Sequence, residues 1–257
     1  MRINSKDFNQ TIEDWTWTNF NRYRLLQSKL LNIKGFKHGF LTKSIGAISP
    51  FEIATKLGQD SMVNHLNQVH GNKVIDITNY KRNYIHNADS IISNKKDDSL
   101  WIYTADCIPI LIGDQTNGQV CACHAGWRGI ASKVLINSIY KLIANGAKIE
   151  NLLIAMGPSI GGDKYQVREE VVKEINNSFQ QKDDEKEYLI IDNHNEGYFK
   201  IDIKLAARKQ LIDLGIKNKQ ISLCPICTFS NSSLFHSWRR EKKRGRQWSF
   251  IISQSNE

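Results

Sequence analysis

The sequence predicts a single α+β domain, in which mixed β-sheets are flanked by helices in α/β/α-like layers. The first observation is that strand-like and helix-like segments follow one another without strict β-α alternation. The second is that the chain contains no internal repeat and no proline-rich linker at which it would divide into domains. The third is its length of 257 residues, which suits one large domain.

The first part of the chain is predicted to be an extension followed by the start of the main domain. Residues 1–30 are polar with isolated aromatic side chains, so we expect an N-terminal extension that packs loosely, and a main domain over residues 31–257. A short helix is expected at 51–57, and the polar run 94–98 is predicted to be a loop. Short apolar runs and period-two alternation predict strands at 35–42, 62–69, 74–78, 88–93 and 100–103.

A β-hairpin stands at the centre of the sequence. Two apolar runs, 108–112 and 119–123, are joined by Asn117-Gly118, a dipeptide typical of tight hairpin turns. Cys121 and Cys123 alternate along the second strand, so we expect both on one face of it as packing residues.

Helices and strands both follow the hairpin. Apolar residues at helical spacing predict a helix over 130–144, with Gly146 just past its end. Further helices are expected at 167–179 and at 203–214, where Gly215 follows. The remaining predictions are a charged loop at 180–187 and strands at 152–156, 188–192, 198–203, 221–223 and 248–252.

Cys107 and His124 lie just outside the two ends of the hairpin, and in an antiparallel pair such residues come close together. Their pairing has three interpretations. The structural one is a buried thiol beside a hydrogen-bonded histidine. The second is a cysteine nucleophile with a histidine base. The third is a transition-metal site, because thiolate and imidazole are both ligands of Zn²⁺.

His70 is the candidate for a third ligand. It ends an apolar segment directly before Gly71, and we expect it at a turn between two strands. Two histidines and one cysteine make three protein ligands and leave a fourth position open. That arrangement is typical of a catalytic zinc rather than a structural one.

Several motifs stand in the order and spacing of one family: N-Q-V-H-G (67–71), A-D-S (88–90), T-A-D-C-I-P-I-L (104–111), H-A-G-W-R-G (124–129) and G-P-S-I-G (157–161). With the tail C-T (227–228) and S-W-R-R…G-R-Q-W (237–248), the chain from about Gly35 onward resembles the YfiH-like, laccase-domain family. Its members were first named multicopper polyphenol oxidases and later interpreted as zinc-dependent purine nucleoside phosphorylases. The resemblance implies a catalytic domain over 31–257 and the metal ligands His70, Cys107 and His124.

The resemblance further implies a zinc enzyme that cleaves the N-glycosidic bond of purine nucleosides with phosphate. Adenosine and inosine are the expected substrates, methylthioadenosine is a further candidate, and adenosine deamination is a candidate side activity. Copper is the alternative metal. Three other functions stay open. The first is a cysteine hydrolase, with Cys107 as nucleophile and His124 as base, or a protein that edits a peptidoglycan precursor. The others are a copper-dependent polyphenol oxidase (laccase) and a non-catalytic protein that binds metal or a cell-wall precursor.

Phosphate needs donors, and the sequence offers cations and a glycine-rich loop. Arg128 is also a candidate catalytic residue beside Cys107 and His124. Backbone N–H groups of the loop 157–162 can cradle an anion, although a tight turn is its simpler interpretation. The candidate phosphate-binding residues are Lys43, Arg128, Ser159, Arg239 and Arg240.

The chain departs from the family pattern at three positions. In the segment H-G-F-L-T-K-S-I-G (38–46), Lys43 stands where the family has Arg and Ile45 where it has Gly. Gln166 stands where the family usually has Glu. The change at Lys43 puts a bidentate grip on an anion at that position in doubt, because Lys is a point charge and Arg a fork.

Composition limits the other partners. The chain is 40% hydrophobic and 24% charged, has no apolar run long enough to cross a bilayer, and does not begin like a signal peptide, so we expect a cytoplasmic protein without membrane segments. Five cysteines are an odd number and favour a reducing compartment. The net charge of +9 comes from scattered lysines, so no nucleic-acid partner is expected. The small-molecule partners are a purine nucleoside and phosphate, and the oligomeric state is a monomer or a dimer.

Two further patterns have simpler interpretations than a site. Cys224-Pro-Ile-Cys227 has no second C-x-x-C beside it, so we expect a structural role. The basic run 239–246 is expected to form a hairpin whose lysines are solvated and whose arginines point in part toward the site.

Overall fold

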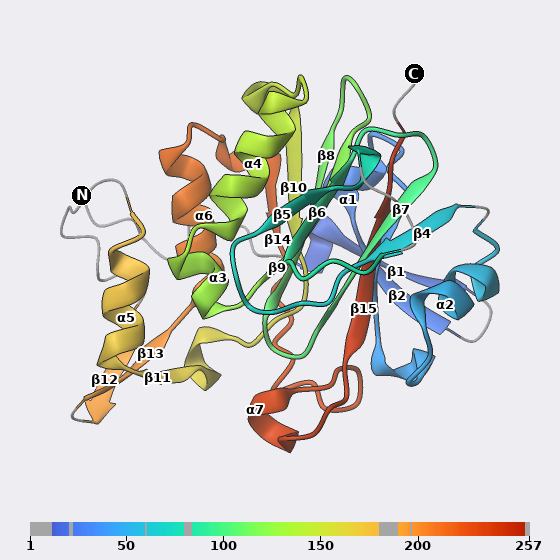
Figure 1. The fold of residues 1–257 in the computed structure, drawn as a ribbon. Helices are drawn as coiled ribbons and strands as arrows, with labels where there is room; N and C mark the ends of the chain where they lie inside the picture. Colours follow the sequence, from blue (N-terminus) through green and yellow to red (C-terminus); the bar gives the residue numbers. More distant parts are fainter. Residues whose placement is uncertain are drawn as a thin grey trace.

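Two six-stranded sheets pack face to face in the computed structural model, which describes residues 12–20, 23–59, 61–79, 84–179, 190–195 and 197–254 (Figure 1). The first sheet has the order β1 (Trp15–Phe20), β2 (Tyr23–Ser28), β3 (His38–Leu41), β15 (Gln247–Ile252), β7 (Asp98–Thr104), β4 (Met62–His65). The second has the order β14 (Ile221–Leu223), β10 (Leu152–Met156), β8 (Ile108–Asp114), β9 (Val120–Ala125), β6 (Ser90–Ser93), β5 (Val74–Asp76). A small third sheet has the order β11 (Gln166–Arg168), β13 (Tyr198–Ile201), β12 (Ile190–Asn195).

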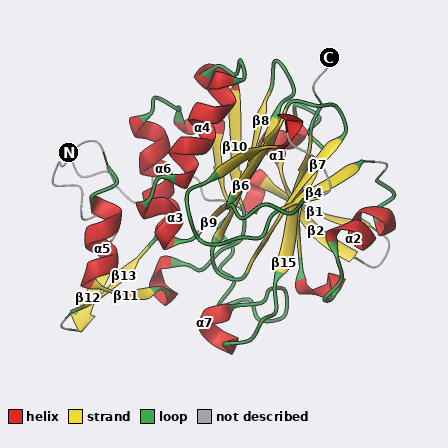
Figure 2. Ribbon diagram, in the orientation of Figure 1, coloured by secondary structure: helices red, strands yellow, loops and turns green. Residues whose placement is uncertain are grey.

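Helices cover the outer faces of both large sheets (Figure 2). The outer face of the second sheet carries α3 (Trp127–Ala131), α4 (Val134–Ala144) and α6 (Ile203–Asp213), while α2 (Pro50–Lys56) lies on the outer face of the first. The shorter elements are α1 (Lys29–Asn32), α5 (Glu169–Asn176) beside the third sheet, and α7 (Trp238–Glu241). The fold class is therefore confirmed as α+β, with the helical layers enclosing two sheets.

Alternation along the central hairpin separates two hydrophobic cores. Ile110, Cys121 and Cys123 point toward α4 and α6, whereas Leu111 and Ala122 point into the core between the two sheets. Both strands are buried on both faces, which is why they read as continuous apolar runs. The prediction that Cys121 and Cys123 share one packed face is confirmed.

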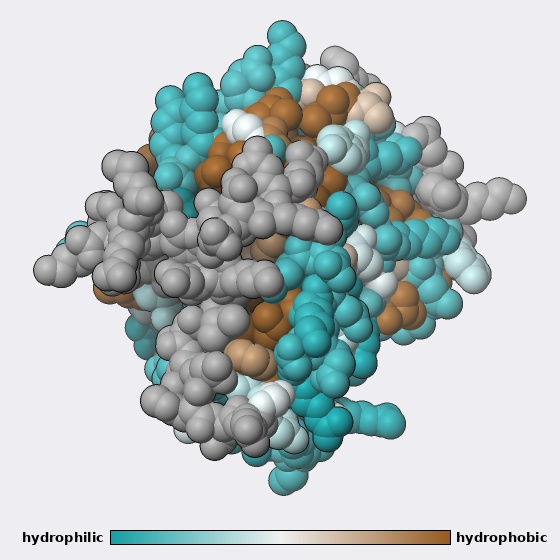
Figure 3. All heavy atoms as spheres, turned by 90° about the vertical axis from the view of Figure 1, so that its left-hand side faces the viewer, coloured by the Kyte–Doolittle hydropathy of each residue, from teal (hydrophilic) through white to brown (hydrophobic). Residues whose placement is uncertain are grey.

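The surface on the helical side is mixed in polarity. Figure 3 looks at that side and shows hydrophilic side chains beside smaller hydrophobic areas. None of the described helices is long and apolar enough to cross a membrane.

The expectation of loose packing is wrong for residues 15–20 and 23–28. These residues form β1 and β2, which pair with each other and with β3 and so extend the first sheet. Trp15 is buried, packs edge-on against Phe40 at 5.5 Å, and donates a hydrogen bond to the carbonyl oxygen of Leu223. Trp15 is one of the isolated aromatic residues, and its partners lie far away in the sequence. The polar residues around it therefore gave no local signal for β1.

Most other elements lie where the sequence predicts them, with several differences. The basic run 239–246, predicted to form a hairpin, begins inside α7, and the helix predicted over 167–179 begins only at Glu169, after β11. The strands predicted on either side of His70 do not pair with each other, because β4 runs parallel to β7 in the first sheet and β5 parallel to β6 in the second. The helix predicted over 130–144 is broken into α3 and α4 at Lys133, whose φ of 67° is left-handed. The charged loop predicted at 180–187 lies outside the described residues.

Candidate functional site

His70, Cys107 and His124 form one cluster in which the ligand-type atoms lie within 4.8 Å of one another. Pairing of β8 with β9 sets Ile108 opposite Ala125, which brings Cys107 next to His124 as the hairpin predicts. The turn between β4 and β5 adds His70 from outside the hairpin. The cluster opens outward, because His124 is buried, Cys107 is half-buried and His70 is exposed.

Asp89 organises this cluster from behind. Its buried carboxylate accepts hydrogen bonds from the backbone N–H groups of Val69 at 3.2 Å, His70 at 2.9 Å and Gly71 at 2.7 Å. It also accepts one from Nδ1 of His124 at 2.8 Å. These bonds hold His70 at its left-handed φ of 59° and leave Nε2 of His124 as the nitrogen that faces the cluster.

The charges within the cluster favour a thiolate. Burial opposes ionisation of Cys107, but the neighbouring imidazole groups of His124 and His70 outweigh burial and lower its pKa to about 6. Burial likewise opposes protonation of His124, but Cys107 and Asp89 together raise its pKa. Burial also opposes ionisation of Asp89, and its hydrogen bonds still hold its pKa below the usual value.

The donor set fits a transition metal. Thiolate and imidazole are ligands of zinc and copper, and three such residues converge from separate elements. The hydrogen bond from His124 to Asp89 is the kind of contact that orients a metal-binding histidine. Gly126 is part of the fit, because a Cβ at this position would lie 2.8 Å from the sulfur of Cys107. The arrangement therefore suggests a metal site, in which His70, Cys107 and His124 are the residues that could hold an ion.

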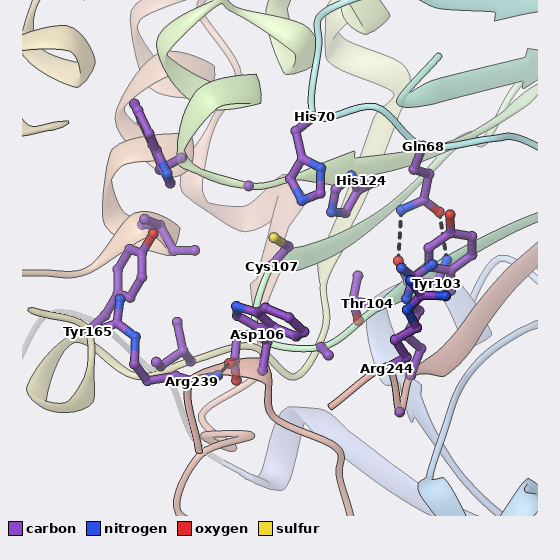
Figure 4. Close-up of a pocket in the computed structure, with 18 of the residues that line it drawn as sticks. Gln68, His70, Tyr103, Thr104, Asp106, Cys107, His124, Tyr165, Arg239 and Arg244 are labelled. Carbon is purple, nitrogen blue, oxygen red and sulfur yellow. Dashed lines mark hydrogen bonds between the residues drawn. The ribbon is translucent and has the colours of Figure 1, made fainter. Parts of the chain in front are cut away.

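A pocket of about 470 Å³ opens over this cluster (Figure 4). This volume lies within the usual range for small-molecule sites. Of the residues that the structure describes, Asp106 is the one acid in its lining. The aromatic residues of the lining are Tyr103, Trp127, Tyr165 and Trp238, and the cationic residues are Arg128, Arg239, Lys242, Lys243, Arg244 and Arg246.

Asp106 is a structural hub rather than a free acid. Its carboxylate accepts hydrogen bonds from the hydroxyls of Thr228 at 2.6 Å and Ser237 at 2.9 Å and from the backbone N–H of Arg239 at 2.7 Å. These contacts tie the start of α7 to the residue next to Cys107. They place Arg239 on the pocket wall, where its guanidinium lies over the ring of Tyr165 at 4.9 Å.

The substitution of Gln for Glu at position 166 leaves the nearest arginine contact intact. The guanidinium of Arg239 donates to the backbone carbonyl oxygen of Gln166 at 2.8 Å, and the side chain of Gln166 is exposed. A main-chain acceptor is available whatever side chain stands at that position.

The structure brings two of the five phosphate candidates, Arg128 and Arg239, to the pocket lining. Lys43 lies elsewhere and donates to the carbonyl oxygen of Ser232. The guanidinium of Arg240 donates hydrogen bonds to the carbonyl oxygens of Thr228, Phe229 and Phe235.

Ser159 and its glycine-rich loop are also held by the protein itself. Ser159 is fully buried and pairs with Cys227 in an isolated β-bridge. The N–H groups of Gly157 and Ile160 bond to the carbonyl oxygens of Pro109 and Asp106, and the N–H of Gly161 bonds to the sulfur of Cys227. Ile160 is the member of the loop that lines the pocket. These contacts favour the interpretation of the loop as a tight turn.

The sequence did not single out Asp89 and Gln68 as residues that hold the site together. Both stand inside quoted motifs, A-D-S and N-Q-V-H-G, and this was the available signal. The side-chain amide of Gln68 makes two hydrogen bonds of 2.8 Å to the backbone of Tyr103, which joins the His70 turn to the end of β7. Tyr165 and Trp238 were also missed as pocket residues, although Trp238 stands inside the quoted tail motif S-W-R-R.

Comparison with known proteins agrees with the motifs. A profile of the family described as multi-copper polyphenol oxidoreductase laccase matches residues 51–254. A protein of Synechocystis sp. named purine nucleoside phosphorylase is 31% identical over 93% of this chain and 97% of its own. Purine nucleoside phosphorylase YfiH of Escherichia coli is 34% identical over 72% of each chain.

Solved structures share the fold. The crystal structure of YlmD from Geobacillus stearothermophilus superimposes with a TM-score of 0.82 at 23% identity, covering 93% of this chain and 99% of that one. The Bacillus licheniformis hypothetical protein YfiH gives a TM-score of 0.80 at 25% identity, covering 91% of this chain and 100% of that one. From its motifs, its fold and these matches, the chain belongs to the YfiH-like, laccase-domain family.

Proposed function

We propose that this protein is a zinc-dependent purine nucleoside phosphorylase, which cleaves the N-glycosidic bond of adenosine or inosine with phosphate. The observation that carries the proposal is the opening of the His70, Cys107 and His124 cluster into a pocket that is lined by cationic side chains. The names of the Synechocystis and Escherichia coli relatives support the same reaction.

The pocket supplies what a neutral nucleoside and an anion would each need. The guanidinium of Arg128 lies 4.3 Å from the centre of the Trp127 ring, exposed at the wall and available to an anion. Arg239 offers a second guanidinium. The rings of Tyr165 and Trp238 provide flat apolar faces on which a purine base would stack. Holding base and phosphate together lowers the entropic part of the barrier.

His70, Cys107 and His124 would hold the zinc, which when bound would supply a Lewis acid to the pocket. The chain's own residues orient the reactants: Asp89 keeps the ligand set in place, and Arg128 and Arg239 hold the phosphate charge. Methylthioadenosine is a further candidate substrate and adenosine deamination a candidate side activity, because the same pocket would bind both purine nucleosides.

A cysteine hydrolase is the second candidate, and the chemistry of Cys107 favours it. A thiol with a pKa of about 6 beside an imidazole is an activated nucleophile if no metal occupies the cluster. Such an enzyme would need no phosphate and no zinc. A copper oxidase would instead consume oxygen and lose activity when zinc replaces copper.

The decisive experiment follows base release from adenosine and inosine against phosphate concentration, with native, chelated and zinc-restored protein in parallel. We expect one zinc per chain, release that rises with phosphate, formation of a sugar phosphate, and a fall of roughly 10²-fold or more after chelation. Cys107→Ala should lose both metal and activity. Cys227→Ser, which removes a thiol outside the cluster, should keep the metal.

Two outcomes would contradict the proposal. Base release that ignores phosphate and survives chelation would indicate the cysteine hydrolase, and full metal occupancy in Cys107→Ala would remove Cys107 from the ligand set.

A further inference from the structure

We propose that the segment 242–246 forms a second anion subsite, which recognises the 5′-phosphate of a purine nucleoside monophosphate. The inference rests on the proposed phosphorolysis and extends its substrate class from nucleosides to nucleotides. Four cations of this segment line the pocket: Lys242, Lys243, Arg244 and Arg246.

The charge of the pocket exceeds what the proposed substrates need. Among the described residues, six cationic side chains line it, and the single acid, Asp106, already accepts three hydrogen bonds from the protein. A neutral nucleoside brings no charge, and inorganic phosphate brings two at most. Arg128 and Arg239 suffice for that phosphate. Lys243 and Arg244, both exposed, have no hydrogen bond or ion pair to the described residues.

The segment is anchored at both ends. Lys242 ends α7, where its N–H donates to the carbonyl oxygen of Trp238 at 2.9 Å. At the other end, the guanidinium of Arg246 lies 4.3 Å from the centre of the Tyr103 ring. Gly245 packs so closely on the ring of His236 that a Cβ would lie 2.3 Å from its Nδ1. Lys243 and Arg244 therefore extend from a fixed turn, which reduces the entropy that binding an anion would cost.

Two arginines, Arg239 and Arg244, lie apart across the pocket, and we call them its two arginine poles. Figure 4 shows Arg239 with Tyr165 on one side of the His70, Cys107 and His124 cluster, and Arg244 with Tyr103 on the other. In this view the cluster lies between the two poles. A substrate with its reacting bond at the cluster and its own phosphate at the pole of Arg244 fits this arrangement, while the attacking phosphate uses the pole of Arg239.

The chemistry is the same with a nucleotide. The C1′–N9 bond breaks and its electron pair leaves with the base, which takes up a proton, while an oxygen of inorganic phosphate forms the new bond to C1′. Adenosine 5′-monophosphate and phosphate thus give adenine and ribose 1,5-bisphosphate. Atoms and charge balance without a further reactant.

The test measures equilibrium binding to the zinc-loaded protein by calorimetry. The ligands are adenosine, adenosine 5′-monophosphate, ribose 5-phosphate and inorganic phosphate. We expect the monophosphate to bind about tenfold or more tightly than adenosine, because two or more charge-assisted hydrogen bonds are added. Lys243→Gln/Arg244→Gln should remove most of this preference. The control Lys141→Gln/Lys148→Gln, which removes two exposed cations on and beyond α4, should preserve it.

Three outcomes would overturn the inference. One is a monophosphate that binds no more tightly than adenosine. Another is a preference that survives in Lys243→Gln/Arg244→Gln or falls equally in the control pair, which would indicate long-range attraction only. The third is a Lys243→Gln/Arg244→Gln variant that loses binding of inorganic phosphate but still binds the monophosphate as the wild type does. That result would make the segment a site for free phosphate. Phosphorolysis of adenosine, assayed in parallel, tests the proposed function separately, because it can succeed while nucleotide preference fails.

Discussion

At the scale of single residues, the site depends on two carboxylates whose hydrogen bonds go to the protein itself. Asp89 shapes the turn that carries His70 and sets the tautomer of His124, while Asp106 positions Arg239. Both act through main-chain N–H groups as well as side chains, so each couples a functional side chain to the backbone that bears it. Both are positioning residues, so we expect their removal to change metal binding, and turnover only as a consequence.

Asp89→Asn should weaken metal binding by about 10- to 100-fold, because one carboxylate oxygen that accepts hydrogen bonds is replaced by an NH₂ group that donates them. Competition with a chromophoric chelator measures the affinity. Asp163→Asn, at an exposed carboxylate, is the matched control. An unchanged affinity in Asp89→Asn would show that the turn and His124 are held by other contacts.

At the scale of elements, the end of β9 and the start of α3 meet the His70 turn with almost no free space. Gly126, the N-cap of α3, lies where a Cβ would be 2.8 Å from the sulfur of Cys107 and 3.3 Å from Cδ2 of His70. A Cβ at Gly71, which also adjoins a ligand, would meet its nearest atoms at an ordinary 3.6 Å. Comparing the two glycines therefore distinguishes a position with no room for a Cβ, Gly126, from a neighbouring position that has room for one, Gly71.

Gly126→Ala should displace the ligands and reduce activity by roughly 10²-fold, the scale of a misplacement of about 1 Å at a reacting centre. Gly71→Ala should retain the metal. Metal analysis and base-release rates on both variants check this expectation. Wild-type metal content in Gly126→Ala would mean that Cys107 can shift without leaving the cluster.

At the scale of the whole molecule, stability comes from three packed interfaces: helices on the second sheet, sheet on sheet, and α2 on the first sheet. His38 is a buried polar residue of the first sheet. Its Nε2 accepts a hydrogen bond from the N–H of Ser28 at 2.9 Å, and its Nδ1–H donates to the carbonyl oxygen of Phe36 at 2.8 Å. Burial keeps the ring neutral and lowers its pKa from 6.5 to about 4.

This histidine should make stability fall with acidity. Between pH 6.5 and 4 the unfolded chain binds a proton at His38 that the folded chain does not, so its contribution is present above pH 6.5 and is lost as the pH falls. From pH 7.5 to 5 the loss is about 2 kcal/mol of unfolding free energy. Urea unfolding of the wild type and His38→Gln measures it: the variant should show a smaller dependence on pH. Parallel curves for the two proteins would contradict the expectation.

The sequence by itself determined the central hairpin and the meeting of Cys107 with His124, because the two apolar strands and their connection are local. The connection over residues 115–119 is longer than the Asn117-Gly118 dipeptide alone, and the register that it sets places Ile108 opposite Ala125. It also determined the family, through motifs that stand in order along the chain. The bounds of α2, β8, β10 and α6 follow from the same local periodicity.

Only the tertiary structure decided the rest of the site. It separated β4 from β5 into different sheets and made β1 and β2 part of the first sheet. It brought Asp89 behind the cluster and Arg239 to the pocket lining. It also paired Arg240 and Lys43 with main-chain carbonyl oxygens. These choices depend on contacts between segments far apart in the chain. A basic or acidic side chain looks the same in the sequence whether it will meet a ligand or a backbone oxygen, and packing alone assigns its partner.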